Sequence, residues 1–276
     1  MGILPSRLIP RLIGGEDDEE INQRPRFNPL SREEDTNNKY STTGRPHTHD
    51  VNVDEAIIIN VRENNNNNNN NIRHDRGRWI KHYSSFHRIL LVGEGDFSFS
   101  ASLAKAFGCR ASNLIATSFN SQDFLMENYQ SAMSNIFELS IRKSRIMYEI
   151  DATTMATHPS LRNIKFDRII FNFPFAGFFK EMSRKTQIWF HRQLVSMFLE
   201  NAKEMISEDG EIHISHKTNG FHREWKLEIV ASWHGLTLIE AVNFNHLDYP
   251  GYNTKRGFGG DNNFDCYPSK TYKFGI

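Results

Sequence analysis

An amide, a proline and two aromatic residues stand together beyond the middle of the chain, and residues of these types could hold a planar nitrogen base. The segment reads Asn172-Phe173-Pro174-Phe175. The side-chain carbonyl of Asn172 can accept a hydrogen bond from an N–H of such a base, and the ring of Phe175 can stack on its face. Asn172, Pro174 and Phe175 are therefore candidate catalytic residues. An apolar strand that stops at a proline is the alternative explanation.

Two glycines one residue apart form a second motif, Gly93-Glu94-Gly95, which is followed by Ser98. Glycines at this spacing let the backbone approach a ligand and leave the N–H groups at a helix start free. The run lacks the Gly-Lys-Ser/Thr of a P-loop, and Ser98 stands where a dinucleotide fingerprint has its third glycine. We expect Gly93, Glu94, Gly95 and Ser98 to bind a cofactor. A tight structural turn is the alternative, and a nicotinamide-dependent oxidoreductase is disfavoured.

Polar residues also follow the next two β-rich runs of the sequence. Asn120 stands where a nucleotide-binding domain usually has an acidic residue for the ribose hydroxyls, and its carbonyl can accept one hydrogen bond. Asp151, with Ala152 after it, could accept a hydrogen bond from an adenine amino group. Asp151 could equally cap the short segment 154–158. Asn120, Asp151 and Ala152 complete the candidate cofactor site.

A glycine-rich loop near the C-terminus joins aromatic and cationic residues, namely Tyr249, Tyr252, Lys255 and Arg256. Such side chains can stack on bases and neutralise phosphates, so the loop is a candidate RNA-binding element together with Lys217. An ordinary surface loop is the alternative, although loops of this length usually have a function.

These candidates need a scaffold that brings strand ends together. Seven β-rich runs are expected, at 89–92, 114–119, 145–150, 166–172, 211–216, 236–244 and 271–274. Helical patterns separate them, at 98–107, 124–137, 190–206 and 221–233. This alternation predicts an α/β fold with a mostly parallel sheet and helices on both faces. Such sheets bind ligands at the carboxyl ends of their strands, where most of the candidate residues stand.

Composition divides the chain of 276 residues into two parts. Residues 1–85 include a run of eight asparagines, Asn64 to Asn71, and only one of the 21 phenylalanines. Polar tracts of this kind cannot bury enough apolar surface to offset the entropy of ordering. We expect a mostly disordered leader over 1–85 and a folded domain over 86–276.

Charge and cysteine content exclude several classes of protein. Lys and Arg total 33, as do Asp and Glu, so the chain is not a strongly basic, non-specific nucleic-acid binder. No apolar run reaches the length of a membrane span. Cys109 and Cys266 are too far apart for a metal-ligand spacing or a disulfide framework. We therefore expect an intracellular protein that is not secreted and has no membrane span or bound metal.

Together these motifs resemble the domain of the 25S rRNA (uridine-N3)-methyltransferases and their plant relatives, in the family's order over residues 88–274. The matching segments are Leu91–Ser100, Ala116–Ser118, Asp151–Thr153, Phe166–Pro174, Pro250–Tyr252 and Lys255–Gly257. The resemblance implies a Rossmann-like class I methyltransferase fold, S-adenosylmethionine as cofactor and a uridine of large-subunit ribosomal RNA as target. It also implies a role in ribosome biogenesis, in the nucleolus, nucleus or cytoplasm.

Two positions depart from the family pattern. Asn120 replaces the usual Asp, and Phe175 replaces the usual His after Asn-Phe-Pro. Because N3 of uridine carries a proton that must leave, either another group accepts it, with Asp151, His213 and His216 as the candidates, or solvent does. The alternative is a catalytically impaired methyltransferase fold that binds RNA or protein.

Overall fold

The computed structural model describes residues 77–257 and 260–276. The leader predicted to be disordered falls mainly on residues 1–76, which lie outside the described part of the chain.

The described segments contain the following elements. The strands are β1 (Trp79–Ile80), β2 (Tyr83–Ser84), β3 (Ile89–Val92), β4 (Leu114–Thr117), β5 (Arg145–Met147), β6 (Phe166–Asn172), β7 (Ile206–Lys217), β8 (Thr237–Asn243) and β9 (Ser269–Gly275). The α-helices are α2 (Ser98–Phe107), α3 (Gln122–Asn128), α4 (Ala132–Ile141), α5 (Arg184–Met205), α6 (Gly220–Arg223) and α7 (Leu227–Ser232). Short 3₁₀ helices lie at Gly108–Asn113, Met155–Thr157 and His246–Asp248.

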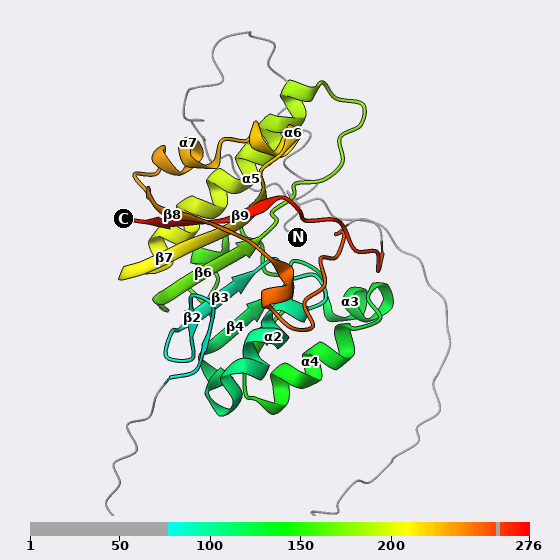
Figure 1. Ribbon diagram of the computed structural model, residues 1–276, viewed down its shortest axis with the longest axis vertical. Helices are drawn as coiled ribbons and strands as arrows, with labels where there is room; N and C mark the ends of the chain where they lie inside the picture. The colour runs from blue at the N-terminus through cyan, green and yellow to red at the C-terminus, as the bar shows by residue number, and fades with distance from the viewer. Residues whose placement is uncertain (1–76, 258–259) are drawn as a thin grey trace, which may run out of the picture. The chain divides into compact units, whose positions relative to one another are not determined.

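The main sheet has seven strands in the order β5-β4-β3-β6-β7-β9-β8, drawn in Figure 1. Neighbouring strands are parallel from β5 to β7, and β9 pairs antiparallel with both β7 and β8. All seven strands expected from the sequence are present, and the mostly parallel α/β architecture is confirmed. The chain order changes direction between β3 and β6, and ligands of such sheets bind in the crevice at this point.

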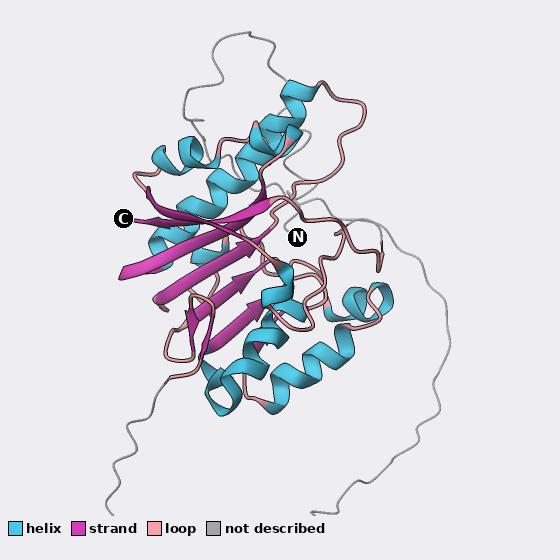
Figure 2. Ribbon diagram, in the orientation of Figure 1, coloured by secondary structure: helices cyan, strands magenta, loops and turns pink. Residues whose placement is uncertain are grey.

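Helices cover both faces of the sheet, as Figure 2 shows. Side chains alternate along β3, so Ile89 and Leu91 pack in a hydrophobic cluster with α2 and α4, whereas Leu90 and Val92 pack in a second cluster with α5 and α7. A strand that is buried on both faces reads as a continuous apolar run. This is why β3 was recognisable from the sequence.

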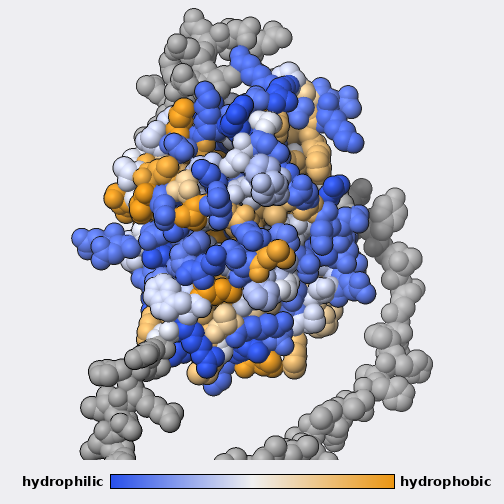
Figure 3. Space-filling view, in the orientation of Figure 1, coloured by the Kyte–Doolittle hydropathy of each residue, from blue (hydrophilic) through white to orange (hydrophobic). Residues whose placement is uncertain are grey.

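Two expected helices are each divided in the structure. The helix expected over 221–233 is interrupted at Lys226, whose φ of 50° ends one helix before α7 begins. The stretch expected over 124–137 is divided between α3 and α4, and its predicted apolar stripe is partly exposed at Phe124 and Phe137. Figure 3 shows the viewed face as mostly hydrophilic, with separate hydrophobic patches.

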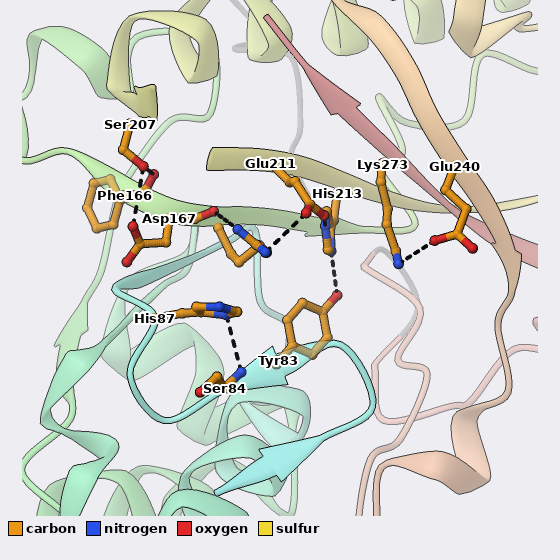
Figure 4. A network of polar contacts seen from close by, with 11 residues as sticks. Tyr83, Ser84, His87, Phe166, Asp167, Ser207, Glu211, His213, Glu240 and Lys273 are labelled. Atoms are coloured by element: carbon orange, nitrogen blue, oxygen red, sulfur yellow. Dashed lines mark hydrogen bonds and ion pairs between the residues drawn. The ribbon is translucent and has the colours of Figure 1, made fainter. Parts of the chain in front are cut away.

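The folded part begins earlier than the boundary predicted at residue 86, because β1 and β2 form a hairpin that packs on the sheet. The Tyr83 hydroxyl lies 3.1 Å from Nδ1 of His213, whose Nε2 lies 2.7 Å from Oε2 of Glu211. Arg168 forms an ion pair with Glu211 at 3.1 Å. Figure 4 shows this network between the hairpin and the sheet. The change in composition follows the polar tract, whereas the packed residues begin earlier, at the hairpin.

Candidate functional site

The side chain of Glu94 stabilises the turn after β3 by hydrogen bonds to the first turn of α2. Its Oε2 accepts hydrogen bonds from the backbone N–H and the hydroxyl of Ser100, at 3.1 and 2.9 Å. Burial raises the pKa of Glu94 from its ordinary value to about 7. Gly93 has a φ of 66°, a left-handed conformation that glycine adopts without strain. The sequence therefore folds Gly93-Glu94-Gly95 into a fixed turn at the start of α2.

Asp96 is a polar residue of this turn that the sequence reasoning did not select. Its side chain is almost fully buried, and Oδ1 accepts a hydrogen bond of 3.0 Å from the Ser98 backbone. Oδ2 is buried without a partner among the described residues. Burial raises the pKa of the Asp96 carboxyl above its ordinary range. No pattern in the sequence distinguishes an aspartate with an unpaired oxygen from other polar residues of a turn.

A narrow cleft of about 30 Å³ separates the glycine turn from the C-terminal loop. Its lining consists of Gly93, Glu94, Gly95, Asp96, Ser98, Asn172, Phe173, Tyr252, Asn253, Lys255 and Phe264. The Asn253 backbone N–H donates to Oγ of Ser98 at 3.0 Å, which ties the loop to α2. The cleft has room for about one water molecule, so a nucleotide-sized ligand requires the loop to move outward.

The candidate residues after β4 and β5 do not line this cleft. Oδ1 of Asp151 accepts hydrogen bonds from the backbone and the hydroxyl of Thr153, at 2.8 and 2.7 Å, so it caps the turn that follows. Ala152 is buried, and the backbone carbonyl of Asn120 accepts a hydrogen bond of 3.3 Å from Glu149. The capping alternative for Asp151 thus describes its contacts in this structure.

The Asn-Phe-Pro-Phe segment stands at the end of β6. Asn172 pairs in register with Ser215 of β7, and both polar atoms of its side-chain amide are buried without a partner within the described segments. Phe173 has a φ of 52°, which is rare for a bulky residue, and its N–H donates to the Ser215 carbonyl at 2.7 Å. Backbone strain of this kind is concentrated at functional sites.

A larger pocket of about 410 Å³ opens on the other side of Phe173. Its lining consists of Phe173, Pro174, Phe175, Phe178, His216, Lys217, His222, Arg256, Gly257, Phe264 and Asp265. We call this the aromatic pocket. Phe173 and Phe264 belong to the walls of both the cleft and the pocket. Aromatic walls of this kind can hold a flipped planar base by stacking.

Phe175 is a supported wall of the aromatic pocket. Its ring lies 4.6 Å from the ring of His191 and 4.9 Å from that of Phe178. Nδ1 of His191 accepts a hydrogen bond of 3.1 Å from the Ala176 backbone, and the imidazole stacks on Trp225 at 4.3 Å. Burial lowers the pKa of His191 to about 3, so the imidazole is neutral. This packing fixes Phe175 for stacking.

The structure separates the three expected proton acceptors. His216 lines the aromatic pocket with 3% of its surface exposed, and its Nε2 has no partner among the residues described. Burial, followed by the charge of His222, lowers the pKa of His216 to about 3. His213 points to the opposite face of β7, toward Tyr83 and Glu211. Asp151 caps its own turn, so His216 alone of the three is at the pocket.

The expected RNA-binding residues divide into three groups. Tyr249 is 3% exposed and packs on Phe99 at 4.7 Å, so its ring belongs to the core and the prediction of base stacking is not supported. Tyr252 and Lys255 line the narrow cleft. Lys217 and Arg256 line the aromatic pocket, where the Lys217 ammonium donates to the Asp265 carbonyl at 2.6 Å.

Within 77–257 and 260–276, no three His, Cys, Asp or Glu side chains are grouped so that they could hold a metal ion. No helix in these segments is long and apolar enough to cross a membrane.

Comparison with known proteins agrees with this geometry. A family model described as BMT5-like, rRNA (uridine-N3-)-methyltransferase BTM5-like, matches residues 90–256. An uncharacterised protein of Arabidopsis thaliana is 48% identical over 203 residues, which cover 71% of this chain and 96% of that protein. Heavy metal-associated isoprenylated plant protein 41 of the same species is 46% identical over 202 residues, which cover 72% of this chain and 39% of that protein.

More distant similarities include a 25S rRNA (uridine(2634)-N(3))-methyltransferase of Saccharomyces cerevisiae, which is 24% identical over 221 residues, 61% of this chain and 65% of that protein. The solved structure of a TehB-like SAM-dependent methyltransferase from Corynebacterium glutamicum has 16% identity and a TM-score of 0.39, and it covers 68% of this chain and 79% of its own. The family match spans more than half of this sequence and includes the glycine turn and the β6 motif. The chain's sheet of seven strands, in the order β5-β4-β3-β6-β7-β9-β8, is the mostly parallel Rossmann-like architecture expected from the sequence. By the family match, the chain belongs to the BMT5-like family of rRNA (uridine-N3-)-methyltransferases.

Proposed function

We propose that this chain transfers a methyl group from S-adenosylmethionine to N3 of a uridine in large-subunit (25S) ribosomal RNA. It would act where that RNA is made or matured, in the nucleolus, the nucleus or the cytoplasm. The finer part of this proposal, the 25S RNA and the N3 atom, is supported by the family description and by the name of the yeast relative.

The observation that carries the proposal is the shared wall between the cleft and the aromatic pocket. Phe173 and Phe264 line both, and Asn172 stands at the same strand end with an amide that has no partner among the residues the structure describes. A methyltransferase must hold its two substrates so that the methyl carbon and the attacking nitrogen are close and in line, because the rate comes mainly from this positioning. Two cavities that share a wall provide this arrangement.

The cleft side suits the cofactor. Gly93 and Gly95 allow close approach of a ligand to the backbone, and Oδ2 of Asp96, buried without a partner in the described segments, offers an acceptor. The methionine part of S-adenosylmethionine carries an ammonium group, and a buried carboxylate is stabilised by such a cation. When bound, the cofactor supplies an electrophilic methyl group. Tyr252 and Lys255 would close over it from the loop.

The pocket side suits the uridine. Phe175 and Pro174 would contact the faces of the base, and the Asn172 amide would hydrogen-bond its edge. The new N3–C bond forms as the S–C bond of the sulfonium breaks, and the N3 proton goes to Nε2 of His216. Nε2 of the neutral imidazole is positioned to accept this proton, but burial lowers the pKa of His216 to about 3 and makes it a weak base, so the proton would have to leave as the methyl group is transferred. His216 would thus be the proton acceptor that Phe175 cannot be.

A direct experiment tests the proposal. The full-length chain is incubated with large-subunit ribosomal RNA and S-adenosylmethionine that carries a labelled methyl group. The RNA is then digested, and the nucleosides are separated by mass. The proposal expects labelled 3-methyluridine with the wild type and at least a hundredfold less with Asn172→Ala. Label in another nucleoside, or none from a chain that binds the cofactor, contradicts the proposal.

The second candidate is a catalytically impaired fold that binds RNA or protein. Phe175, which cannot take a proton, and the small volume of the cleft favour it. A calorimetric titration with S-adenosylmethionine, S-adenosylhomocysteine and NAD separates the possibilities. Saturable binding of the first two supports the methyltransferase, binding of NAD supports an oxidoreductase, and no binding supports the impaired module.

A further inference from the structure

A second cavity, of about 270 Å³, lies next to the aromatic pocket. Its lining consists of His216, Lys217, His222, Arg223, Lys226, Leu227, Glu228, Ile229 and Tyr272. His216, Lys217 and His222 also line the aromatic pocket. The two cavities therefore border on each other along these three side chains, and we call the second one the cationic cavity.

Positive charge prevails in the cationic cavity. Lys217, Arg223 and Lys226 line it, against the single carboxylate of Glu228. Glu224, the acidic neighbour of Arg223, is bound by Arg184 instead. No carboxylate forms an ion pair with Arg223 or Lys226 within the described part of the chain.

The local fold explains why these cations face solvent. Trp225 and Leu227 are buried beneath the α6–α7 junction, whereas Arg223 and Lys226 are exposed. The positive φ of Lys226 ends one helix before the next begins. A continuous helix would rotate these positions regularly around its axis. The break keeps Trp225 buried and leaves Arg223 and Lys226 exposed at the rim of the cavity.

One class of ligand combines the chemistry of both cavities. A nucleic acid strand has planar bases, which suit aromatic walls, and a phosphate on each nucleotide, which suits Lys and Arg. Four Phe and one Pro line the pocket, and three cations line the adjoining cavity. Only a strand with an unstacked base fits both at once, because a base in a duplex cannot enter a pocket.

We propose that the RNA strand continues from the aromatic pocket into the cationic cavity, where Lys217, Arg223 and Lys226 contact the phosphates next to the target base. This inference rests on the proposed function and adds a path for the strand. The path runs along the end of β7 and over the α6–α7 junction. Arg223 and Lys226 lie outside the 249–256 loop, which the sequence favoured, together with Lys217, as the RNA contact.

The test compares two double variants of the full-length chain. Arg223→Gln with Lys226→Gln removes the two exposed cations of the cavity, and Lys105→Gln with Arg162→Gln removes two exposed cations elsewhere. The probe is a short, fluorescently labelled single-stranded RNA that contains uridine. Its dissociation constant is measured by anisotropy over a range of salt concentrations. Calorimetry with S-adenosylhomocysteine and thermal unfolding show that each variant is folded.

The cavity variant is expected to bind the RNA on the order of tenfold more weakly at low salt, with the slope of log K against log salt smaller by about 1.4 for two lost contacts. The control pair is expected to keep the wild-type slope. Wild-type affinity and slope in the cavity variant overturn the inference. An equal loss for polyglutamate, with no greater loss for RNA, also overturns it in favour of an acidic protein partner.

The inference and the proposed function fail separately. One outcome is that the slope of log K against log salt is smaller in the cavity variant while the wild type makes no 3-methyluridine. The strand path then stands and the methyltransferase proposal falls. If the wild type methylates uridine while the cavity variant binds and methylates RNA as the wild type does, only the strand path falls.

Discussion

The rings of Phe173 and Phe264 meet edge to face, with their centroids 5.3 Å apart. They come from segments far apart in the sequence, one at the end of β6 and one in the loop before β9. Both rings line the narrow cleft and the aromatic pocket. These two rings, which we call the partition, therefore border both cavities, between which a methyl group would pass under the proposed function.

Removing one ring of the partition should impair transfer more than folding. Phe264→Ala is expected to lower the rate of methyl transfer by at least tenfold, because the base loses one wall and water gains access to the path. Phe264 is only half-buried, so unfolding should become easier by about 1–2 kcal/mol, less than for a fully buried ring.

Single-turnover rates and urea unfolding measure the two effects. Phe264→Leu, which keeps part of the wall, is the matched control and should recover most of the rate. A rate that follows the loss of stability across both variants would assign Phe264 a packing role alone.

Asp96 should bind the amino-acid part of the cofactor. Asp96→Asn is expected to weaken binding of S-adenosylmethionine and S-adenosylhomocysteine by about 10- to 100-fold, because an ion pair with the ammonium is replaced by a neutral contact. Binding of 5′-methylthioadenosine, which lacks the ammonium, should not change. Calorimetry measures all three.

The same variant tests the unpaired state of Oδ2. Oδ2 has no partner among the described residues, and the amide oxygen of an asparagine can still accept from the Ser98 backbone, so Asp96→Asn should unfold at the same or a higher temperature than the wild type. Equal weakening for all three ligands, or a marked loss of stability, would show that Asp96 supports the turn and not the ammonium.

The residues that sequence reasoning recovered and those that it missed differ in a physical way. β3 and β6 are buried on both faces, so their apolar runs and the motifs after them were visible in a single segment. The aromatic pocket was not, because it forms only when the segment around Phe175 meets Arg256 and Phe264. No local pattern encodes such a meeting.

Aromatic residues were the other source of error. Tyr249 stands in a loop beside cations. An aromatic residue at such a position could either stack on a base or pack in the core, and the sequence does not distinguish the two. The structure packs it on Phe99. Lys226 shows a related limit, because a positive φ at a lysine has no signal in composition or periodicity.

Glu94 should make stability depend on pH. Its pKa rises from 4.5 to about 7 on folding, because burial opposes ionisation. A raised carboxyl pKa favours the folded state at low pH, and this contribution is lost as pH rises from about 4.5 through about 7. The loss is about 3 kcal/mol for a shift of this size.

Urea unfolding of the wild type and Glu94→Gln at pH 5 and pH 8 measures this contribution. The amide keeps an oxygen that can accept from Ser100 but does not ionise, so the variant should lose less stability than the wild type between the two values. Parallel pH profiles for the two proteins would contradict the burial argument.

His216 and His213 are three residues apart on β7 and face opposite sides of the sheet, so they make a matched pair. His216→Gln is expected to lower the rate of methyl transfer by about 10²-fold, the low end of the range for loss of a general base, because burial makes this imidazole a weak base. Cofactor binding should not change, because His216 does not line the cleft. His213→Gln should lower stability through the Tyr83 and Glu211 contacts and leave the rate intact.

The pH profile separates proton transfer from packing. Burial holds the pKa of His216 at about 3, so the imidazole is already neutral above pH 5 and the wild-type rate should show no inflection near 6.5. The rate should instead rise with pH as the uridine imide ionises. In His216→Gln the rate should rise more steeply at high pH, where the base needs no acceptor, and the deficit should shrink. A deficit that stays constant from pH 6 to pH 10 would make His216 a packing residue of the pocket and not its proton acceptor.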